Sequence, residues 1–342
     1  MYNSTQYHEF PDFQLASGRT LPARIAYVTL GELNDQRDNV VLVAHGFTSS
    51  HRFILPDSVA AEGSWAELIG PGKAIDTNRY FVVSSNALGS SYGTTGAADI
   101  DVATGGRFGC DFPEIGFSDI AALQHALLQS MGVTRLRAVV GVSMGGFQAW
   151  QWAVQYPDVV ERVGVILSAF CTARGAAALE ATLATDGAWN GGHPAAGAMA
   201  PLLARIRADT LRRYGMGAWL EKNGMTDSEI DAQLQAQARA WACEFDPCAL
   251  LVLRRAMDAF DVRPCLNRIQ ASVLLVLSTT DVLFPASSGP EMVAQLQASN
   301  VRAKFHVLDS AYGHLASGLD WQKWRGVLKD FIDGSESRAD LQ

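Results

Sequence analysis

The stretch 138–146 limits what this chain can fold into more than any other part of it. It reads Ala-Val-Val-Gly-Val-Ser-Met-Gly-Gly, so an apolar strand pattern enters Gly-x-Ser-x-Gly, and a helix-forming stretch, 147–156, follows at once. A strand that turns sharply into a helix at a serine is the pattern of a nucleophile elbow. Glycines flank the serine because the turn is too tight for larger neighbours. The pattern predicts that Ser143 is a nucleophile, and an ordinary strand-to-helix turn is the alternative.

Short apolar runs bounded by turn residues recur along the chain, and helical patterns separate many of them. This alternation predicts an α/β fold with a mostly parallel sheet flanked by helices. Two early segments, 10–15 and 23–30, alternate between apolar and polar residues and predict an antiparallel start to the sheet. The apolar runs are 40–44, 80–84, 138–142, 163–168, 273–277 and 303–308.

The alternation stops after Ser168. Residues 172–265 show no convincing strand pattern, and this stretch is too long for a simple connection between two strands. The sequence therefore predicts a helical lid inserted at 172–265 into a core formed by 1–171 and 266–342. The expected helices of this lid are 176–185, 199–214, 226–241 and 247–260.

A serine hydroxyl needs a base to remove its proton, and a histidine oriented by a carboxylate is the usual base. In α/β-hydrolases the order along the chain is serine, then acid, then histidine, each on a loop after a strand. His314 follows the last predicted strand and is the expected base, whereas His306 lies inside that strand and is expected to be structural. Asp281 follows the strand 273–277 and is the expected acid. Asp309 is the rival, but it lies close to His314 along the chain.

Acyl transfer also requires N–H donors for the oxyanion that develops on the attacked carbonyl. The residue after the nucleophile, Met144, is expected to supply one donor through its backbone. The early strand 40–44 leads into His-Gly-Phe-Thr, a pattern typical of the loop that supplies the second donor, so Phe47 is the other candidate. His45 is expected to organise this loop rather than to act as a second base.

Composition argues against several classes of protein. Of the 342 residues, 48% are hydrophobic and 18% are charged, and the net charge is −8. An acidic chain without a basic run is not expected to bind nucleic acid or an anionic membrane. The first residues lack a basic and apolar leader, so we expect no signal peptide and a cytoplasmic location. The acid-rich tail after Asp333 is expected to be frayed.

Five cysteines occur in the chain, and none of them forms a C-x-x-C pair. We expect reduced, mostly buried thiols. No Cys/His cluster has the spacing of a metal site, and no pattern implies a cofactor, so the sequence predicts neither. The cysteines are Cys110, Cys171, Cys243, Cys248 and Cys265.

Long motifs of this chain resemble the homoserine O-acetyltransferase family. The resemblance runs from about residue 10 to 331, is weakest in the predicted lid, and implies an α/β-hydrolase core with a helical lid and an acyl-enzyme mechanism. It places the family's triad on Ser143, Asp281 and His314, and it implies a homodimer formed through the lids. The motifs are 68–81, 86–89 with 92–96, 255–261 and 281–285.

The chain departs from this family at three places. Phe117 or Ser118 stands where the family usually has an arginine, Leu315 stands where it has an aspartate after Gly-His, and the lid pattern at 208–212 is altered. An amino-acid acceptor carries an ammonium and a carboxylate, and a buried site must pair both. The chain therefore resembles the branch of the family whose members hydrolyse small alkyl acetates.

These observations predict a carboxylic-ester hydrolase that acts on short-chain, acetyl esters and whose partner is a small molecule. The alternative is an acyl-CoA-dependent O-acetyltransferase, because a triad serves both reactions. A C–C or amide hydrolase and a non-catalytic binding protein on the same fold are the remaining hypotheses. The natural ester and the pathway are not encoded in any motif of the sequence.

Overall fold

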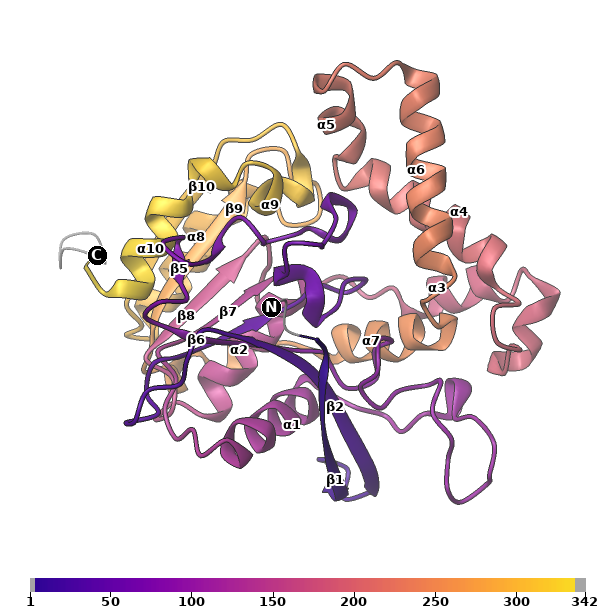
Figure 1. The fold of residues 1–342 in the computed structure, drawn as a ribbon, viewed down its shortest axis with the longest axis horizontal. Coiled ribbons are helices and arrows are strands. Elements are labelled where there is room, and N and C mark those ends of the chain that lie inside the picture. The colour runs from indigo at the N-terminus through magenta and orange to yellow at the C-terminus, as the bar shows by residue number, and fades with distance from the viewer. Residues whose placement is uncertain (1–3, 336–342) are drawn as a thin grey trace.

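The computed structural model describes residues 4–335 and contains one large sheet with helices on both faces (Figure 1). Eight strands form the sheet in the order β1-β2-β6-β3-β7-β8-β9-β10. Two very short strands, β4 and β5, pair separately. The strands are β1 (Gln6–Gln14), β2 (Thr20–Leu30), β3 (Val40–Ala44), β4 (Ile69–Gly70), β5 (Ile75–Asp76), β6 (Phe81–Ser85), β7 (Ala138–Val142), β8 (Arg162–Ile166), β9 (Ser272–Ser278) and β10 (Ala303–Leu308).

From β6 to β10 every neighbouring pair of strands is parallel, and β2 runs antiparallel to both β1 and β6. The prediction of a mostly parallel α/β sheet with an antiparallel start is therefore confirmed. In a parallel sheet the carboxyl ends of the strands meet at one edge, where a ligand site usually forms. The loops after β3, β7, β9 and β10 all leave from that edge.

The strands of the centre are buried on both faces, so they lack alternation between apolar and polar residues. Val139 packs with one apolar cluster, and its neighbour Val140 packs with another on the opposite face. The first cluster includes residues of α1 (Phe117–Ser130), α2 (Met144–Gln155) and α8 (Gly289–Ala298). The second includes α10 (Arg325–Asp333) and the start of α9 (Ala316–Leu319).

Between β8 and β9 the chain is helical, as the sequence predicts, and these helices lie together beside the sheet (Figure 1). Four of them match the expected helices. The structure adds α5, a short helix that the sequence pattern misses. The helices are α3 (Ala176–Leu183), α4 (Ala200–Arg213), α5 (Met216–Lys222), α6 (Asp227–Ala242) and α7 (Pro247–Ala259). None of the helices in the described range 4–335 is long and apolar enough to cross a membrane.

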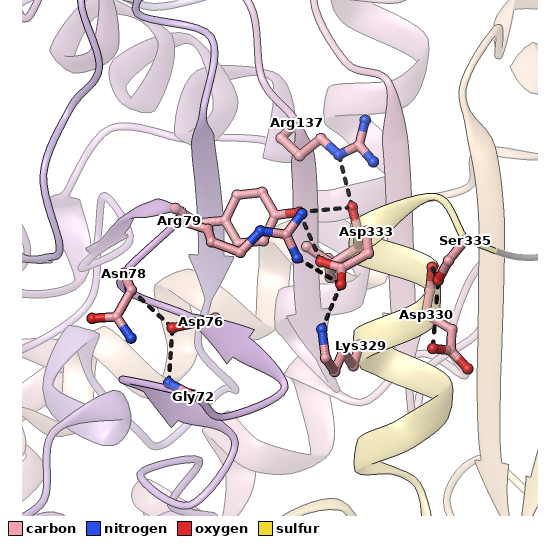
Figure 2. A network of polar contacts seen from close by, with 11 residues as sticks. Gly72, Asp76, Asn78, Arg79, Arg137, Lys329, Asp330, Asp333 and Ser335 are labelled. Atoms are coloured by element: carbon pink, nitrogen blue, oxygen red, sulfur yellow. Dashed lines mark hydrogen bonds and ion pairs between the residues drawn. The ribbon is translucent and has the colours of Figure 1, made fainter.

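A polar network fastens the last helix to the end of the sheet opposite the candidate site (Figure 2). The Asp333 carboxylate at the end of α10 accepts hydrogen bonds from the Tyr80 hydroxyl and from Lys329, and it pairs with Arg79 at 2.7 Å. Arg137, just before β7, donates through Nε to the carbonyl of Ile332 at 2.7 Å. These contacts hold the amino end of β7. The loop after β7 leaves from the other, carboxyl end of this five-residue strand. The predicted frayed tail lies largely in 336–342, outside the described residues.

Candidate active site

Ser143 lies at the turn between β7 and α2 with φ 57° and ψ −120°, a backbone conformation that costs energy for any residue except glycine. Its amide N–H donates to the Ile166 carbonyl at 2.9 Å, which fixes the turn against β8. A Cβ on Gly141 would lie 1.9 Å from the Gly145 carbonyl oxygen, and a Cβ on Gly145 would lie 2.1 Å from the Ala44 carbonyl oxygen. The two glycines therefore allow strand and helix to approach closely while the serine side chain points out of the turn.

The structure brings Ser143, His314 and Asp281 together although they are far apart along the chain. The His314 Nε2 atom lies 2.8 Å from the Ser143 Oγ atom, and the His314 Nδ1 atom lies 2.8 Å from the Asp281 Oδ2 atom. The second carboxylate oxygen of Asp281 accepts the Leu283 N–H at 2.9 Å. All three side chains are buried. In this arrangement the carboxylate favours the Nδ1–H tautomer and leaves Nε2 free to accept the serine proton.

Aromatic rings from two elements hold the imidazole of His314. The Tyr214 ring at the end of α4 lies 4.8 Å from the imidazole centroid, and the Phe284 ring lies 5.7 Å from it. The backbone is held too, because the Leu315 N–H donates to the Tyr214 carbonyl at 3.2 Å. The loop of the candidate base is thus anchored on the helical segment 172–265.

Two backbone amides near the serine have no acceptor among the described residues. They are the N–H groups of Met144, the first residue of α2, and of Phe47, in the loop after β3. The loop is close to the nucleophile, since a Cβ on Gly46 would lie 3.7 Å from the Ser143 Cβ. Free N–H donors on both sides of a serine hydroxyl can stabilise an oxyanion.

His45 organises the loop that carries Phe47, as expected from the sequence. Its Nδ1–H donates to the Gly46 carbonyl at 2.8 Å, and its Nε2 accepts the Ala87 N–H at 3.0 Å. Both ring nitrogens are occupied and the side chain is fully buried, so the ring is neutral and cannot act as a second base. Burial lowers the pKa of His45 to about 4, which the bond to the Gly46 carbonyl only partly opposes.

A chain of buried hydrogen bonds from α1 and α2 also supports the loop after β3. The Trp152 indole N–H donates to the Gln124 side-chain oxygen at 2.7 Å, and Gln124 donates to Gln148 at 2.7 Å. Gln148 in turn donates to the carbonyl of His45 at 3.3 Å. Because α1 and α2 supply these groups, the two helices set the position of the loop after β3.

The serine opens into a cavity of about 770 Å³ whose far wall is formed by the helical segment 172–265. Four arginines line this cavity, and no aspartate or glutamate of the described residues does. Thr48, Tyr214 and Trp241 add further polar groups, and Leu250, Met257 and Phe284 are among the apolar lining residues. The arginines are Arg174, Arg207, Arg213 and Arg254.

Arg207 differs from the other three because it is almost fully buried, with a relative exposure of 2%. Its guanidinium donates to the Thr48 hydroxyl at 2.7 Å and to the Ala61 carbonyl at 2.6 Å, and it lies 5.2 Å from the Trp241 ring centroid. No carboxylate of the described residues pairs with it. Sequence analysis missed this residue, although Arg207 occupies the apolar face of its helix, four residues after Leu203 and four before Leu211.

One of the sequence arguments about the acceptor site was wrong. The Phe117 ring packs in the core against the rings of Phe147 and Phe260, at 5.6 and 4.9 Å, and neither Phe117 nor Ser118 lines the cavity. Leu315 does not line it either and packs in an apolar cluster with residues of α4, α5 and α6. The polar character of the pocket therefore comes from the helical segment.

The remaining candidates lie apart from this cluster. The Asp309 carboxylate accepts a hydrogen bond from the Thr279 hydroxyl at 3.3 Å rather than from His314, and His306 lies within β10. Within residues 4–335 no group of three or more histidine, cysteine, aspartate or glutamate side chains could hold a metal ion.

Comparison with known proteins identifies the family. The model of the alpha/beta hydrolase fold matches residues 39–319. The chain is 34% identical to a homoserine O-acetyltransferase of Carboxydothermus hydrogenoformans, over 95% of this chain and 93% of that protein. This protein belongs to the homoserine O-acetyltransferase family of α/β-hydrolases.

Solved structures that this chain resembles include both a transferase and an esterase. The fold matches the homoserine O-acetyltransferase of Bacillus anthracis with a TM-score of 0.86 at 25% identity, over 97% of this chain and 98% of that one. It matches the esterase E22 with a TM-score of 0.85 at 27% identity, over 96% and 100% of the two chains. Membership of the family therefore leaves two reactions to choose between.

Proposed function

We propose that this family member is a serine carboxylic-ester hydrolase that cleaves short-chain, acetyl esters. The observation that carries the proposal is the hydrogen-bonded line from Asp281 through His314 to Ser143, at the wall of a cavity and with two free amides in the adjoining turn and loop. This is the set of groups that acyl transfer through a covalent intermediate requires.

The geometry assigns a role to each group. The Ser143 hydroxyl attacks the ester carbonyl while Nε2 of His314 takes its proton, and Asp281 stabilises the imidazolium that forms. The N–H groups of Met144 and Phe47 bind the oxyanion. His314 then protonates the leaving alcohol, activates a water molecule against the acyl-enzyme, and returns the proton to Ser143 as the acid is released.

The charges of the cavity support water rather than homoserine as the acyl acceptor. Homoserine carries an ammonium group and a carboxylate, and a cavity whose charged lining residues, among those described, are all arginines can pair the carboxylate but leaves the ammonium group without a partner. Water has no such requirement. The cationic wall therefore supports hydrolysis, although the residues responsible are not those on which the sequence argument relied.

The acyl-CoA-dependent acetyltransferase is kept as the second candidate because of the same arginines. An acyl donor that carries phosphates would be attracted by a cationic cavity, and the relatives with about one-third identity are named homoserine O-acetyltransferases.

A single comparison of substrates separates the two reactions. The purified enzyme is offered 4-nitrophenyl or ethyl acetate in water, and separately acetyl-CoA with homoserine. We expect ester hydrolysis that disappears in Ser143→Ala and little CoA release in the second assay. Efficient homoserine acetylation together with weak ester hydrolysis would sink the proposal.

Three further expectations from the sequence stay predictions. They are that residues 172–265 act as a lid, that two copies associate through this segment, and that the enzyme acts in the cytoplasm. Sedimentation velocity of the whole protein and of a variant with charged substitutions on the outer face of α6 would test the second.

A further inference from the structure

The five cysteines are free thiols, but the prediction that most of them are buried was wrong. Only Cys248 is buried, Cys243 is exposed, and the other three are intermediate. Two of the five lie beside the same residue although 137 residues of chain separate them, because the thiols of Cys110 and Cys248 both lie next to Gly192. The pair lies outside the catalytic cavity, so the proposed reaction does not use it.

Several contacts hold the two thiols in place. Cys110 lies in the short 3-10 helix Gly109–Asp111, which packs against α7, and Cys248 is the second residue of α7. The Cys248 thiol donates to the Gly192 carbonyl at 3.2 Å. A glycine is needed at position 192, because a Cβ there would lie only 2.8 Å from the Cys110 Cβ.

Polar contacts on both sides fix the same two segments. Asp246, which caps α7, pairs with Arg107 and donates its N–H to the Ser91 hydroxyl at 2.9 Å. The segment 90–111 and the start of α7 are therefore docked on each other. This docking keeps the two thiols beside Gly192, and a disulfide requires two cysteines whose backbones already lie close together.

The two thiols are also chemically unequal. The neighbouring Cys248 thiol lowers the pKa of the half-buried Cys110 thiol, and the nearby Arg255 acts in the same direction, whereas burial, Glu180 and Asp246 oppose it. The neighbouring Cys110 and burial raise the pKa of Cys248. Cys110 is thus the more accessible and the more acidic of the two thiols, and Cys248 is the one protected from solvent.

We propose that Cys110 and Cys248 form a peroxide-sensitive dithiol that closes reversibly to a disulfide between the segment after β6 and helix α7. The Cys110 thiolate attacks a hydroperoxide and becomes a sulfenic acid, and the hydroperoxide leaves as an alcohol, or as water when it is hydrogen peroxide. The Cys248 thiol then attacks the sulfenic sulfur, forms the S–S bond and releases the sulfenic oxygen as water. A low-molecular-weight thiol reduces the bond again.

The bond would reach the catalytic cavity through α7. This helix carries Leu250, Arg254 and Met257 in the cavity wall. A disulfide at the first turn of α7 would tie this wall to the segment after β6. Oxidation state and ester turnover can therefore be compared on the same sample. The chemistry of the thiols does not depend on the proposed esterase activity.

The test treats the folded protein with a short pulse of hydrogen peroxide and quenches it with an alkylating agent. We expect the free thiols counted after denaturation to fall from five to three. Peptide mass spectrometry should find Cys110 linked to Cys248, and dithiothreitol should restore all five thiols. The exposed Cys243 is the internal control, and Cys243→Ser should behave as the wild type.

Variants then separate the two roles. Cys248→Ser should leave a sulfenic acid on Cys110 that dimedone traps, and Cys110→Ser should leave Cys248 unmodified at the same dose. The proposal fails if wild-type protein forms no Cys110–Cys248 link, or if dimedone labels Cys243 as readily as it labels Cys110 in Cys248→Ser. Neither result depends on whether the enzyme hydrolyses esters.

Discussion

Ser143 adopts a backbone conformation that its neighbours impose. Its φ of 57° with ψ −120° is held by the bond to Ile166 and by the close approach of the two flanking glycines. Such strain costs about 1–3 kcal/mol and persists only where the surrounding structure enforces it. This conformation directs the Ser143 hydroxyl out of the turn and places its oxygen 2.8 Å from Nε2 of His314.

Replacing the serine separates strain from catalysis. Ser143→Ala keeps the strain and removes the nucleophile, so we expect activity to fall by about 10⁴-fold or more. Ser143→Gly should be equally inactive but more stable than Ser143→Ala by about 1 kcal/mol, because glycine accepts the conformation without cost. Urea unfolding of both variants checks this. Equal stability of the two would show that the turn is not strained.

Two buried histidines make stability depend on pH. Burial lowers the pKa of His45 to about 4, and burial together with the charges of His45 and Arg52 lowers the pKa of His51 to about 3. Both values lie below the usual 6.5, so the unfolded chain takes up protons that the folded chain rejects. Their contribution to the free energy of unfolding is complete above pH 6.5. It is lost as the pH falls towards 4 for His45 and towards 3 for His51.

We expect each of these histidines to remove about 2 kcal/mol from the free energy of unfolding between pH 7 and pH 5. His51→Gln should lose about half of this pH dependence, because it removes one of the two titrating groups. Glutamine can keep the contact that His51 Nε2 makes with the Thr5 hydroxyl at 2.9 Å, so the fold should be retained. Urea denaturation at the two pH values measures both. An unchanged pH dependence in His51→Gln would contradict the assignment.

At the scale of elements, the close contact of α2 with β3 and β7 depends on glycines. A Cβ on Gly145 would lie 2.1 Å from a carbonyl oxygen of β3, and backbone cannot give way as a flexible side chain can. We expect Gly145→Ala to lower the free energy of unfolding by about 3 kcal/mol. Gly187→Ala is the matched control, since nothing lies within 4 Å of its Cβ position. Thermal unfolding of the two variants makes the comparison.

The contact between the helical segment and the loop of His314 is the second point at this scale. Leu315 is buried with Leu211, Met216, Leu220 and Leu234, and a carboxylate there would have no cation beside it in this cluster. We expect Leu315→Asp to cost about 3 kcal/mol and not to create homoserine acetylation. Leu315→Met, which keeps the volume, should cost less than about 1.5 kcal/mol. Homoserine acetylation by Leu315→Asp, with acetyl-CoA, would overturn this account.

Elements could be predicted where periodicity and length were sufficient. The expected strands 40–44, 138–142 and 303–308 have the observed bounds, and the first two are continuous five-residue apolar runs that end at a polar residue on each side. Helix α5 was missed because it has only seven residues and directly follows Gly215, whose φ is 99°. So short a helix is held by packing rather than by its own pattern, and packing is not visible in local sequence.

At the scale of the whole molecule, charge is distributed unevenly. The chain carries a net charge of −8, but all the charged residues that line the cavity beside Ser143, among those that the structure describes, are arginines. A cavity with low-dielectric walls concentrates such a field and favours neutral or anionic ligands over cations. Substrate charge should therefore matter more than substrate size for turnover.

Acetylcholine and 3,3-dimethylbutyl acetate test this, because they differ in charge and hardly in shape. We expect kcat/KM for the cationic ester to be about tenfold lower, which corresponds to about 1.4 kcal/mol. Raising the salt concentration to 0.5 M should narrow the difference by screening the exposed arginines. Equal rates for the two esters would show that the arginines do not control access.

The three groups of the candidate site could be located from sequence because each follows a strand of one parallel sheet, and topology alone brings such loops to one edge. The acceptor wall could not, because Arg207 and Tyr214 come from a segment whose place over that edge no local pattern encodes. Phe117 shows the converse error. A resemblance in sequence assigned it to the pocket, whereas its ring lies in the core.

The bond from the Leu315 amide to the Tyr214 carbonyl has a consequence for engineering. Specificity in such a scaffold invites exchange of the helical segment between relatives as a cassette. In this protein the exchanged segment includes Tyr214, whose ring contacts the imidazole of His314 and whose carbonyl accepts the Leu315 N–H. A chimaera that imports a new pocket must therefore reproduce that junction, or it will bind its ligand and fail to turn it over.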